Sequence, residues 1–229
     1  MNSFINSFFQ LFYPKYCLSC NKPIYNNKSI LCESCYSQLS FTYYSSFIDN
    51  PLYEKFIGQA NIEYAFALCY FYKGGILQDC LHALKYKGRK DVGVFFGKLI
   101  GNELSNINTP IDLIIPVPLH PKKEKIRGYN QSEMIAKGIS KVLNVPINTN
   151  DVVRTKFTET QTKKTKWERY DNLNGVFAIK NTQTFANKHL LIVDDVITTG
   201  ATTVSLIELF KNIPNTKVSV ACVGTPDKI

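Results

Sequence analysis

Hydrophobic and polar positions along this chain form two alternating patterns over residues 62–223. Short apolar runs bounded by turn residues indicate buried strands, whereas apolar residues that recur every three or four positions indicate amphipathic helices. The predicted strands cover 62–72, 111–117, 176–179 and 217–223, with a further one beginning at 189. The predicted helices cover 76–84, 92–104 and 132–143, with a further one opening at 198–202. This alternation predicts an α/β fold around a parallel sheet.

The rest of the chain is organised around the stretch 189–203. Side chains of a strand alternate between faces, so Asp194 and Asp195 cannot both point into the core. The predicted strand therefore ends where these two residues emerge. Adjacent carboxylates can accept hydrogen bonds from the vicinal hydroxyls of a ribose. The helix N-terminus that follows favours an anion, and Gly200 lets the backbone turn closely around it. The residues of this predicted phosphate loop are Thr198, Thr199, Gly200, Ala201 and Thr202. The order of features predicts a ribose 5-phosphate site; an ordinary turn with Asp as helix cap is the alternative.

The ten residues 193–202 carry a family resemblance. They read Val-Asp-Asp-Val-Ile-Thr-Thr-Gly-Ala-Thr, which resembles the 5-phosphoribosyl-1-pyrophosphate (PRPP) motif of type I phosphoribosyltransferases. Hydrophobic residues, two acidic residues and a Thr/Gly-rich run form that family's signature. The resemblance implies a Rossmann-like parallel sheet in which Asp194 and Asp195 are the catalytic pair and 198–202 bind the 5-phosphate.

A basic segment, 120–131, follows the strand predicted at 111–117 and precedes the helix predicted at 132–143. A basic loop that leads into a helix N-terminus favours an anion, and ligands of parallel sheets bind at the carboxyl ends of strands. In type I phosphoribosyltransferases the loop after the corresponding strand holds the pyrophosphate; a solvated basic loop is the alternative. The candidate residues are Lys122, Lys123, Arg127, Tyr129 and Asn130.

Two further polar segments accompany these motifs. The basic run 84–90 is interpreted as the end of a helix capped by Gly88, with its charges placed favourably for the helix dipole; a phosphate-facing loop is the alternative. Residues 154–169 are Thr-rich and lack a core period, which predicts a long loop of the kind that often serves as a lid. The resemblance implies that this loop is the hood of the family. Its candidate residues are Thr160, Gln161 and Lys163.

Cysteine spacing predicts a metal site near the N-terminus. Two Cys-x2-Cys pairs complete a closed tetrahedral site of the kind that binds structural Zn²⁺; a pair of redox dithiols is the alternative. The predicted ligands are Cys17, Cys20, Cys32 and Cys35. The remaining cysteines lie in apolar contexts and are predicted to be small buried hydrophobes. They are Cys69, Cys80 and Cys222.

Composition limits the class of protein. With 229 residues and 45% hydrophobic content, the chain is long enough for one medium domain and a small appendage. We expect 1–60 to hold a short helix at 1–12, the zinc module and a linker, and 61–229 to form the phosphoribosyltransferase-like domain. No apolar run predicts a transmembrane segment, and seven cysteines without a secretory signal predict a cytoplasmic location. The net charge of +9 suits either nucleic acid or a polyphosphate substrate.

Taken together, the motifs resemble the ComF family of competence-associated, phosphoribosyltransferase-like proteins over nearly the whole chain. They are the four-cysteine module, Leu-Lys-Tyr-Lys-Gly-Arg at 84–89, Pro-Val-Pro-Leu at 116–119, Arg-Gly-Tyr-Asn-Gln at 127–131, Thr-Gln-Thr at 160–162 and the PRPP motif. The resemblance implies a zinc-bearing protein that binds PRPP with Mg²⁺ and is linked to DNA uptake. We predict phosphoribosyl transfer to an acceptor that the sequence does not identify. A non-catalytic PRPP sensor and a single-stranded DNA-binding component are the alternatives, with DNA and competence proteins as candidate partners.

Overall fold

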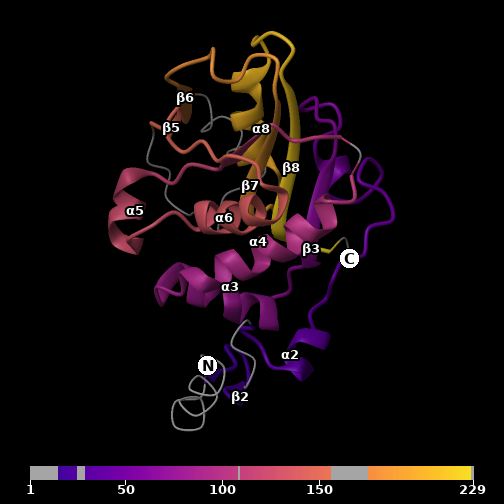
Figure 1. Ribbon diagram of the computed structural model, residues 1–229, viewed down its shortest axis with the longest axis vertical. Helices are drawn as coiled ribbons and strands as arrows, with labels where there is room; N and C mark the ends of the chain where they lie inside the picture. The colour runs from indigo at the N-terminus through magenta and orange to yellow at the C-terminus, as the bar shows by residue number, and fades with distance from the viewer. Residues whose placement is uncertain (1–14, 25–28, 108, 156–174, 228–229) are drawn as a thin grey trace, which may run out of the picture.

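The central element of the structure is a parallel sheet (Figure 1). This computed structural model describes residues 15–24, 29–107, 109–155 and 175–227. Within these ranges the sheet has four strands, hydrogen-bonded in the order β3-β8-β7-β4. They are β3 (Ala65–Tyr70), β4 (Leu113–Pro116), β7 (His189–Val196) and β8 (Lys217–Thr225). The predicted α/β fold around a parallel sheet is therefore confirmed.

The direction in which successive strands are added to the sheet reverses at β4. A parallel bridge between Ile114 and Ile147 extends the sheet on one side of β4, and β7 pairs with its other side. The β4–β7 pairing ends with Pro116 opposite Val193, so the last residues of β7 extend beyond β4. Open α/β sheets bind ligands at such a switch point, outside the carboxyl ends of the strands.

The two faces of the sheet are covered by different kinds of element (Figure 1). One face, here called the helical face, is covered by α3 (Ile76–Tyr86), α4 (Lys90–Leu104) and α6 (Gln131–Leu143). The other, here called the loop face, is covered by α8 (Ala201–Ile207) and the 3-10 turns η1 (Tyr53–Lys55) and η2 (Glu208–Phe210), with irregular segments. Side chains of β7 alternate between them: Leu191 and Val193 pack on the helical face, and Leu190 and Ile192 on the loop face.

Glycines join α4 to α6 on the helical face. Gly93, Gly97 and Gly101 recur every four residues along α4, and Gly138 of α6 lies against Gly97. A Cβ atom at Gly97 would collide with the main-chain carbonyl oxygen of Ile135. Only glycine allows two helix backbones to lie this close. This close contact between α4 and α6, here called the joint, fixes the position of α6 and places its N-terminus beside β7.

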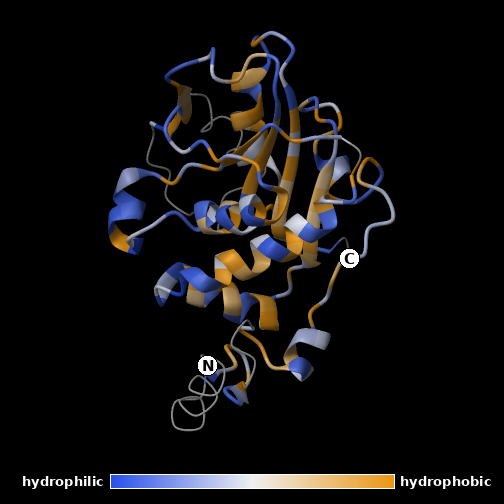
Figure 2. Ribbon diagram, in the orientation of Figure 1, coloured by the Kyte–Doolittle hydropathy of each residue, from blue (hydrophilic) through white to orange (hydrophobic). Residues whose placement is uncertain are grey.

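Residues 121–127 form a helix, α5 (Pro121–Arg127), so the prediction of a basic loop was wrong at this point. Local caps explain the helix. The ring of His120 accepts a hydrogen bond from the N–H of Lys122, a proline occupies the first helical position, and Gly128 ends the helix at φ 77°. The helix projects from the body and is hydrophilic along most of its length (Figure 2).

Other boundaries differ from the prediction by a few residues. The strand predicted over 62–72 is shorter, and the helix after the phosphate loop ends in the 3-10 turn η2. An unpredicted strand, β5 (Val152–Arg154), pairs antiparallel with β6 (Phe177–Ile179). The helix predicted at 1–12 lies outside the described residues. Across the described ranges, none of the helices has the length and apolar character needed to cross a bilayer.

The cysteine module docks on α3, at the lower end of the view in Figure 1. It contains β1 (Lys15–Tyr16), β2 (Pro23–Ile24) and α2 (Glu33–Ser37). Ser19 Oγ donates a hydrogen bond to Asp79 Oδ2 at 2.9 Å, and Leu31 shares an apolar cluster with Leu77. The hydrogen bond attaches the module to the first turn of α3, and its apolar side chains join the core of the helical face.

The segment between the cysteine module and β3 enters the core of the loop face. Leu52 and Phe56 are fully buried there. Asn50 Nδ2 donates to the carbonyl of Ala65 at 3.0 Å, and Asn50 Oδ1 accepts from Leu52 N–H at 3.0 Å. The division into 1–60 and 61–229 stays a prediction, but this part of the predicted linker packs against the sheet.

Candidate functional site

Two acidic side chains lie at the end of β7, where the sequence predicts them. Asp194 Oδ1 accepts a hydrogen bond from Ser132 Oγ at 2.9 Å, which joins the strand to the N-terminus of α6. Asp195 Oδ2 pairs with Lys85 Nζ at 2.7 Å, which joins it to the last turn of α3. Both carboxylates are therefore positioned by the helical face, at the switch point between β4 and β7.

The charge of Asp195 affects the ionisation of its neighbour Asp194. Burial raises the pKa of Asp194 to about 7, and the negative charge of Asp195 acts in the same direction. The N–H of Asp195, the Ser132 hydroxyl and the Lys85 ammonium stabilise the ionised form and offset part of this effect. Adjacent acidic groups in a partly dry crevice are typical of functional sites. Asp194 is thus close to its charge transition at neutral pH.

The predicted phosphate loop, 198–202, connects β7 to α8. The N–H of Ile197 donates to the carbonyl of Gly224 at 3.0 Å, which fixes the start of the loop to β8. Gly200 has φ 80°, a left-handed conformation that favours glycine. Because α8 is only seven residues long, the shape of the loop matters more here than the dipole of the helix. Three threonine side chains of the loop retain solvent exposure and can reach a ligand; they are Thr198, Thr199 and Thr202.

Lys55 supports this loop from the loop face. Its Nζ donates to the carbonyl of Thr198 at 2.7 Å and to Thr225 Oγ1 at 2.8 Å, so one ammonium joins the loop to the end of β8. Burial lowers the pKa of Lys55. The ring of the next residue, Phe56, lies below Gly200. The phosphate loop therefore rests on the segment that the sequence predicted as a linker.

Two of the pyrophosphate candidates are buried and hold the chain in place. The hydroxyl of Tyr129 donates to the carbonyl of Leu84 at the end of α3. Asn130 caps α6, because its Oδ1 accepts a hydrogen bond from Ser132 N–H at 3.0 Å. These side chains position the segment between α5 and α6, and their contact with a ligand stays a prediction.

The three basic candidates are spread more widely. Arg127 Nη1 donates to Gln131 Oε1 at 2.7 Å, and its Cζ lies 5.5 Å from the centre of the Tyr86 ring, so it lies beside the end of α3. Lys122 and Lys123 lie on the projecting helix α5. The structure places Arg127 next to the site elements, while the roles of the two lysines stay predictions.

Sequence reasoning missed the two lysines that contact the predicted site. Lys85 belongs to the basic run 84–90, which was interpreted as an ordinary helix end. Gly88 does follow α3 with φ 68°, as that interpretation expects, but Lys85 points to Asp195. The signal that could have found it is the motif at 84–89. For Lys55, in an irregular segment far from the motif in sequence, no such signal exists.

The hood candidates, Thr160, Gln161 and Lys163, lie outside the described residues. Arg154, where the predicted hood begins, is described. Its Cζ lies 5.4 Å from the centre of the Phe177 ring, which joins β5 to β6. Burial lowers the pKa of Arg154, and the charge of Asp194 opposes that shift. The start of the predicted hood is therefore within electrostatic reach of the acidic pair.

The four predicted metal ligands, the cysteines of the N-terminal module, converge on one point. Their Sγ atoms lie within 4.8 Å of one another, and those of Cys20 and Cys32 are 3.5 Å apart. Zn–S bonds of about 2.3 Å in a tetrahedron place sulfur atoms roughly 3.8 Å apart, so the cluster fits this geometry. Burial raises the pKa of Cys35 to about 12, and the neighbouring thiols act in the same direction. The donor set fits a sulfur-binding divalent metal. The other cysteines, Cys69, Cys80 and Cys222, are fully buried, as predicted.

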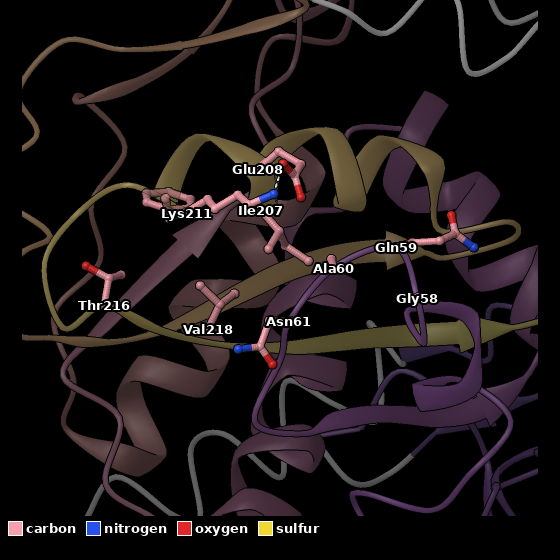
Figure 3. A pocket seen from close by; sticks show the side chains of 10 residues that line it. Gly58, Gln59, Ala60, Asn61, Ile207, Glu208, Lys211, Thr216 and Val218 are labelled. Carbon is pink, nitrogen blue, oxygen red and sulfur yellow. Dashed lines mark ion pairs between the residues drawn. The ribbon is translucent and has the colours of Figure 1, made fainter.

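A pocket of about 490 Å³ lies elsewhere, on the loop face (Figure 3). Gln59 and Asn61 line one side, and Glu208 and Lys211, which pair at 3.6 Å, line the other. Val218, also in its lining, belongs to the amino end of β8. The pocket therefore lies at the end of the strand opposite to the acidic pair and shares no residue with the candidate site.

Comparisons with known proteins agree with this geometry. The family model named Phosphoribosyl transferase domain matches residues 130–227, which include α6, β7 and the phosphate loop. DNA utilization protein YhgH of Shigella flexneri is 29% identical over 153 residues, which are 64% of this chain and 66% of that protein. Competence protein F of Haemophilus influenzae is 34% identical over 110 residues, or 48% of each chain. The match thus spans less than two thirds of the length of these relatives.

Among solved structures, a crystal structure of adenine phosphoribosyltransferase aligns with a TM-score of 0.40 and 17% identity, over 64% of this chain and 75% of that one. The order of strands and the matched domain are the stronger observations. Together, the comparisons show a chain that is similar to the phosphoribosyl transferase domain over residues 130–227 and to proteins named for competence and DNA utilization, as the resemblance to the ComF family predicts.

Proposed function

We propose that the protein binds PRPP at the carboxyl ends of β4 and β7 and transfers its phosphoribosyl group to an acceptor. The observation that carries the proposal is the acidic pair at the end of β7, followed at once by the glycine-turned loop 198–202. Vicinal hydroxyls need paired acceptors, and a 5-phosphate needs N–H and hydroxyl donors. The two sets of groups lie in the order that a ribose 5-phosphate requires.

Each part of the site has a role in this proposal. Asp194 and Asp195 accept hydrogen bonds from the ribose hydroxyls and orient the sugar. The 5-phosphate is held by Thr198, Thr199, Gly200, Ala201 and Thr202. Little covalent chemistry is asked of the protein, so the rate comes from positioning and from stabilising the charge of the leaving pyrophosphate. The pyrophosphate is contacted by Lys122, Lys123, Arg127, Tyr129 and Asn130. The hood residues Thr160, Gln161 and Lys163 exclude water from the reacting carbon.

Two metals are part of the proposal. The hard oxygen donors of the acidic pair suit Mg²⁺, which when bound with PRPP neutralises charge on the pyrophosphate. The closed set of four thiolates suits Zn²⁺ in a purely structural role. The ion would contribute much of the folding energy of the module, since the segment between the cysteine pairs is too short for a core of its own.

Calorimetry of PRPP binding, with and without Mg²⁺, tests the proposal on protein of verified zinc content. We expect saturable, Mg²⁺-dependent binding in the wild type. Asp195→Ala should weaken binding by about tenfold or more, because it removes a charged acceptor for the diol. Zinc content and the unfolding transition should stay close to those of the wild type.

The matched control is Asp112→Asn, since Asp112 accepts a hydrogen bond from the N–H of His189 at the other end of β7. This variant should bind PRPP like the wild type. Absence of PRPP binding by folded wild-type protein would overturn the proposal. Pyrophosphate release with a base or amine acceptor separates a transferase from a sensor, because a sensor binds without release.

A second candidate function is binding of single-stranded DNA. The names of the relatives refer to competence and DNA utilization, and the basic helix α5 lies near the exposed ring of Tyr86, which contacts Arg127. Bases stack on exposed aromatic rings while basic side chains follow the phosphates. A steep loss of oligonucleotide affinity with rising salt would support it. A cytoplasmic location and contact with competence proteins belong to the same proposal.

A further inference from the structure

The ion pair between Lys85 and Asp195 uses the carboxylate that the proposed function requires. Lys85 Nζ lies 2.7 Å from Asp195 Oδ2, and the two side chains are only 25% and 14% exposed. The other oxygen, Oδ1, accepts a hydrogen bond from Val196 N–H at 2.7 Å. Both oxygens of Asp195 therefore already have partners. A ribose hydroxyl that reaches this carboxylate competes with the ammonium of Lys85.

The backbone around Lys85 is held on both sides. The carbonyl of Leu84 accepts a hydrogen bond from the Tyr129 hydroxyl, and the ring of Tyr86 packs against the guanidinium of Arg127. The last turn of α3 is thus attached to the segment that leads from α5 to α6. The long lysine side chain remains the part that can move, because its ammonium is a point charge on a flexible four-carbon stem.

Positive charge gathers where α3 ends against this segment. Lys90 Nζ lies 5.1 Å from the centre of the Tyr129 ring, and Arg127 lies beside Tyr86. With Lys85, these residues place three cations around one end of α3. A group with several negative charges, such as a pyrophosphate, is attracted to such a cluster. An ammonium displaced from Asp195 therefore has a new partner nearby only when the ligand carries that group.

We propose that Lys85 exchanges partners: ribose hydroxyls displace its ammonium from Asp195, and the ammonium then pairs with the pyrophosphate of the same ligand. This inference rests on the proposed function. It makes Lys85 a residue that selects PRPP over ribose 5-phosphate. A ligand without pyrophosphate must break the ion pair and leaves the Lys85 ammonium without a new anionic partner. PRPP instead offers its pyrophosphate to the ammonium in place of Asp195.

The test is to titrate Lys85→Met with two ligands, PRPP and ribose 5-phosphate, each with Mg²⁺ at pH 8.5. Lys85 helps keep the pKa of Asp194 down, so the alkaline buffer keeps Asp194 ionised when the lysine is absent. Ribose 5-phosphate should bind about fivefold more tightly, because no partly exposed ion pair has to be broken. PRPP should bind about tenfold more weakly, because a charged contact to its pyrophosphate is lost. The opposite signs are the diagnostic result.

Lys87→Met is the matched control, since it removes the same charge two residues away at an exposed position. It should change neither affinity by more than about twofold, the range of surface charge effects. Lys85→Arg keeps the charge and should keep the preference for PRPP. Unfolding curves of all variants confirm that they fold.

Three outcomes decide between the proposals. If the wild type binds PRPP and Lys85→Met shifts both ligands in the same direction, or shifts neither, the exchange is refuted and the proposed function stands. If the folded wild type binds neither ligand, the proposed function and the exchange are both refuted. If Lys85→Met shifts the two affinities in opposite directions and Lys87→Met does not, the proposed function and the exchange are both supported.

Discussion

The helical face and the loop face hold the candidate site in different ways. On the helical face, three helices of 11, 15 and 13 residues pack on the sheet and on one another. On the loop face, the longest helix has seven residues, and irregular segments complete the cover in the described part of the chain. The acidic pair is positioned from the first face by Ser132 and Lys85, and the phosphate loop from the second by Lys55.

This difference indicates that two parts of one site are held in place by different kinds of interaction. Close-packed helices set positions through steric contact, which resists displacement in every direction. A polar brace such as Lys55 acts through a few directed bonds and allows local opening once they break. The acidic pair should therefore lose its position only when the core unfolds, whereas the phosphate loop should open locally while the core stays folded. The predictions below test this contrast.

The largest effect is expected at the joint between α4 and α6. Gly97→Ala places a Cβ atom against the carbonyl oxygen of Ile135, and a main-chain atom cannot give way cheaply. We expect a loss of about 3 kcal/mol in the free energy of unfolding, the upper range for overpacking. Equilibrium denaturation in urea measures it.

The control for this prediction is Gly88→Ala. Gly88 has φ 68°, and among the described residues other than its chain neighbours no atom lies within 4 Å of the position that an alanine methyl group would take, so the left-handed backbone is what opposes alanine there. A cost of about 1 kcal/mol is expected. Equal losses in the two variants would show that close helix contact does not govern the helical face.

A smaller and more local effect is expected from Lys55→Met. The change removes the bonds to Thr198 and Thr225 and keeps the apolar stem. Two bonds from a charged donor are worth at least about 1.4 kcal/mol, so amide exchange in 197–203 should become roughly tenfold faster without ligand. Hydrogen exchange followed by mass spectrometry measures it.

Lys217→Met is the comparison, because Lys217 pairs only loosely with Glu63, at 3.6 Å, at the amino end of β8. It should leave exchange in the phosphate loop unchanged. Unchanged exchange in Lys55→Met would mean that the loop holds its own shape, and the contrast between the two faces would then be lost.

The smallest effect concerns the pH dependence of stability. The pKa of Asp194 is raised from 3.8 to about 7, so between these values the folded protein keeps a proton that the unfolded chain has lost. The folded state binds more protons there, and stability must fall as pH rises from about 4 to 7. Asp194→Asn should flatten this fall by roughly 1 kcal/mol between pH 6 and 7, measured by urea denaturation.

Asp49→Asn, which neutralises an exposed carboxylate, serves as the reference for this measurement. Its profile should run parallel to that of the wild type. If Asp194→Asn also runs parallel to the wild type, the carboxylate is not held protonated by its surroundings on the helical face.

The sequence predicted the strands and helices with strong periodicity because their burial pattern is local. The β7 run and the helix at 132–143 are examples, and the two cysteine pairs are another, since ligand spacing is written directly in the chain. The 121–127 helix was missed because its basic composition suggested a loop, although His120, Pro121 and Gly128 carry the capping signals. Lys55 could not be placed, since its contact with Thr198 crosses 143 residues of chain and depends on the packed fold. Lys85 lies in the motif at 84–89, but its partner Asp195 is 110 residues away and only the packed fold brings the two together.

The strand order has a consequence for synthesis of the protein. β3 and β4, the first of the four strands to leave the ribosome, lie at the two ends of the strand order, and β7 and β8, the last, lie between them. The nascent chain cannot pair its first strands with each other in native order and must wait for the C-terminal third. During that wait apolar strands are exposed to aggregation. Dependence on chaperones should therefore end only after β8 is released from the ribosome.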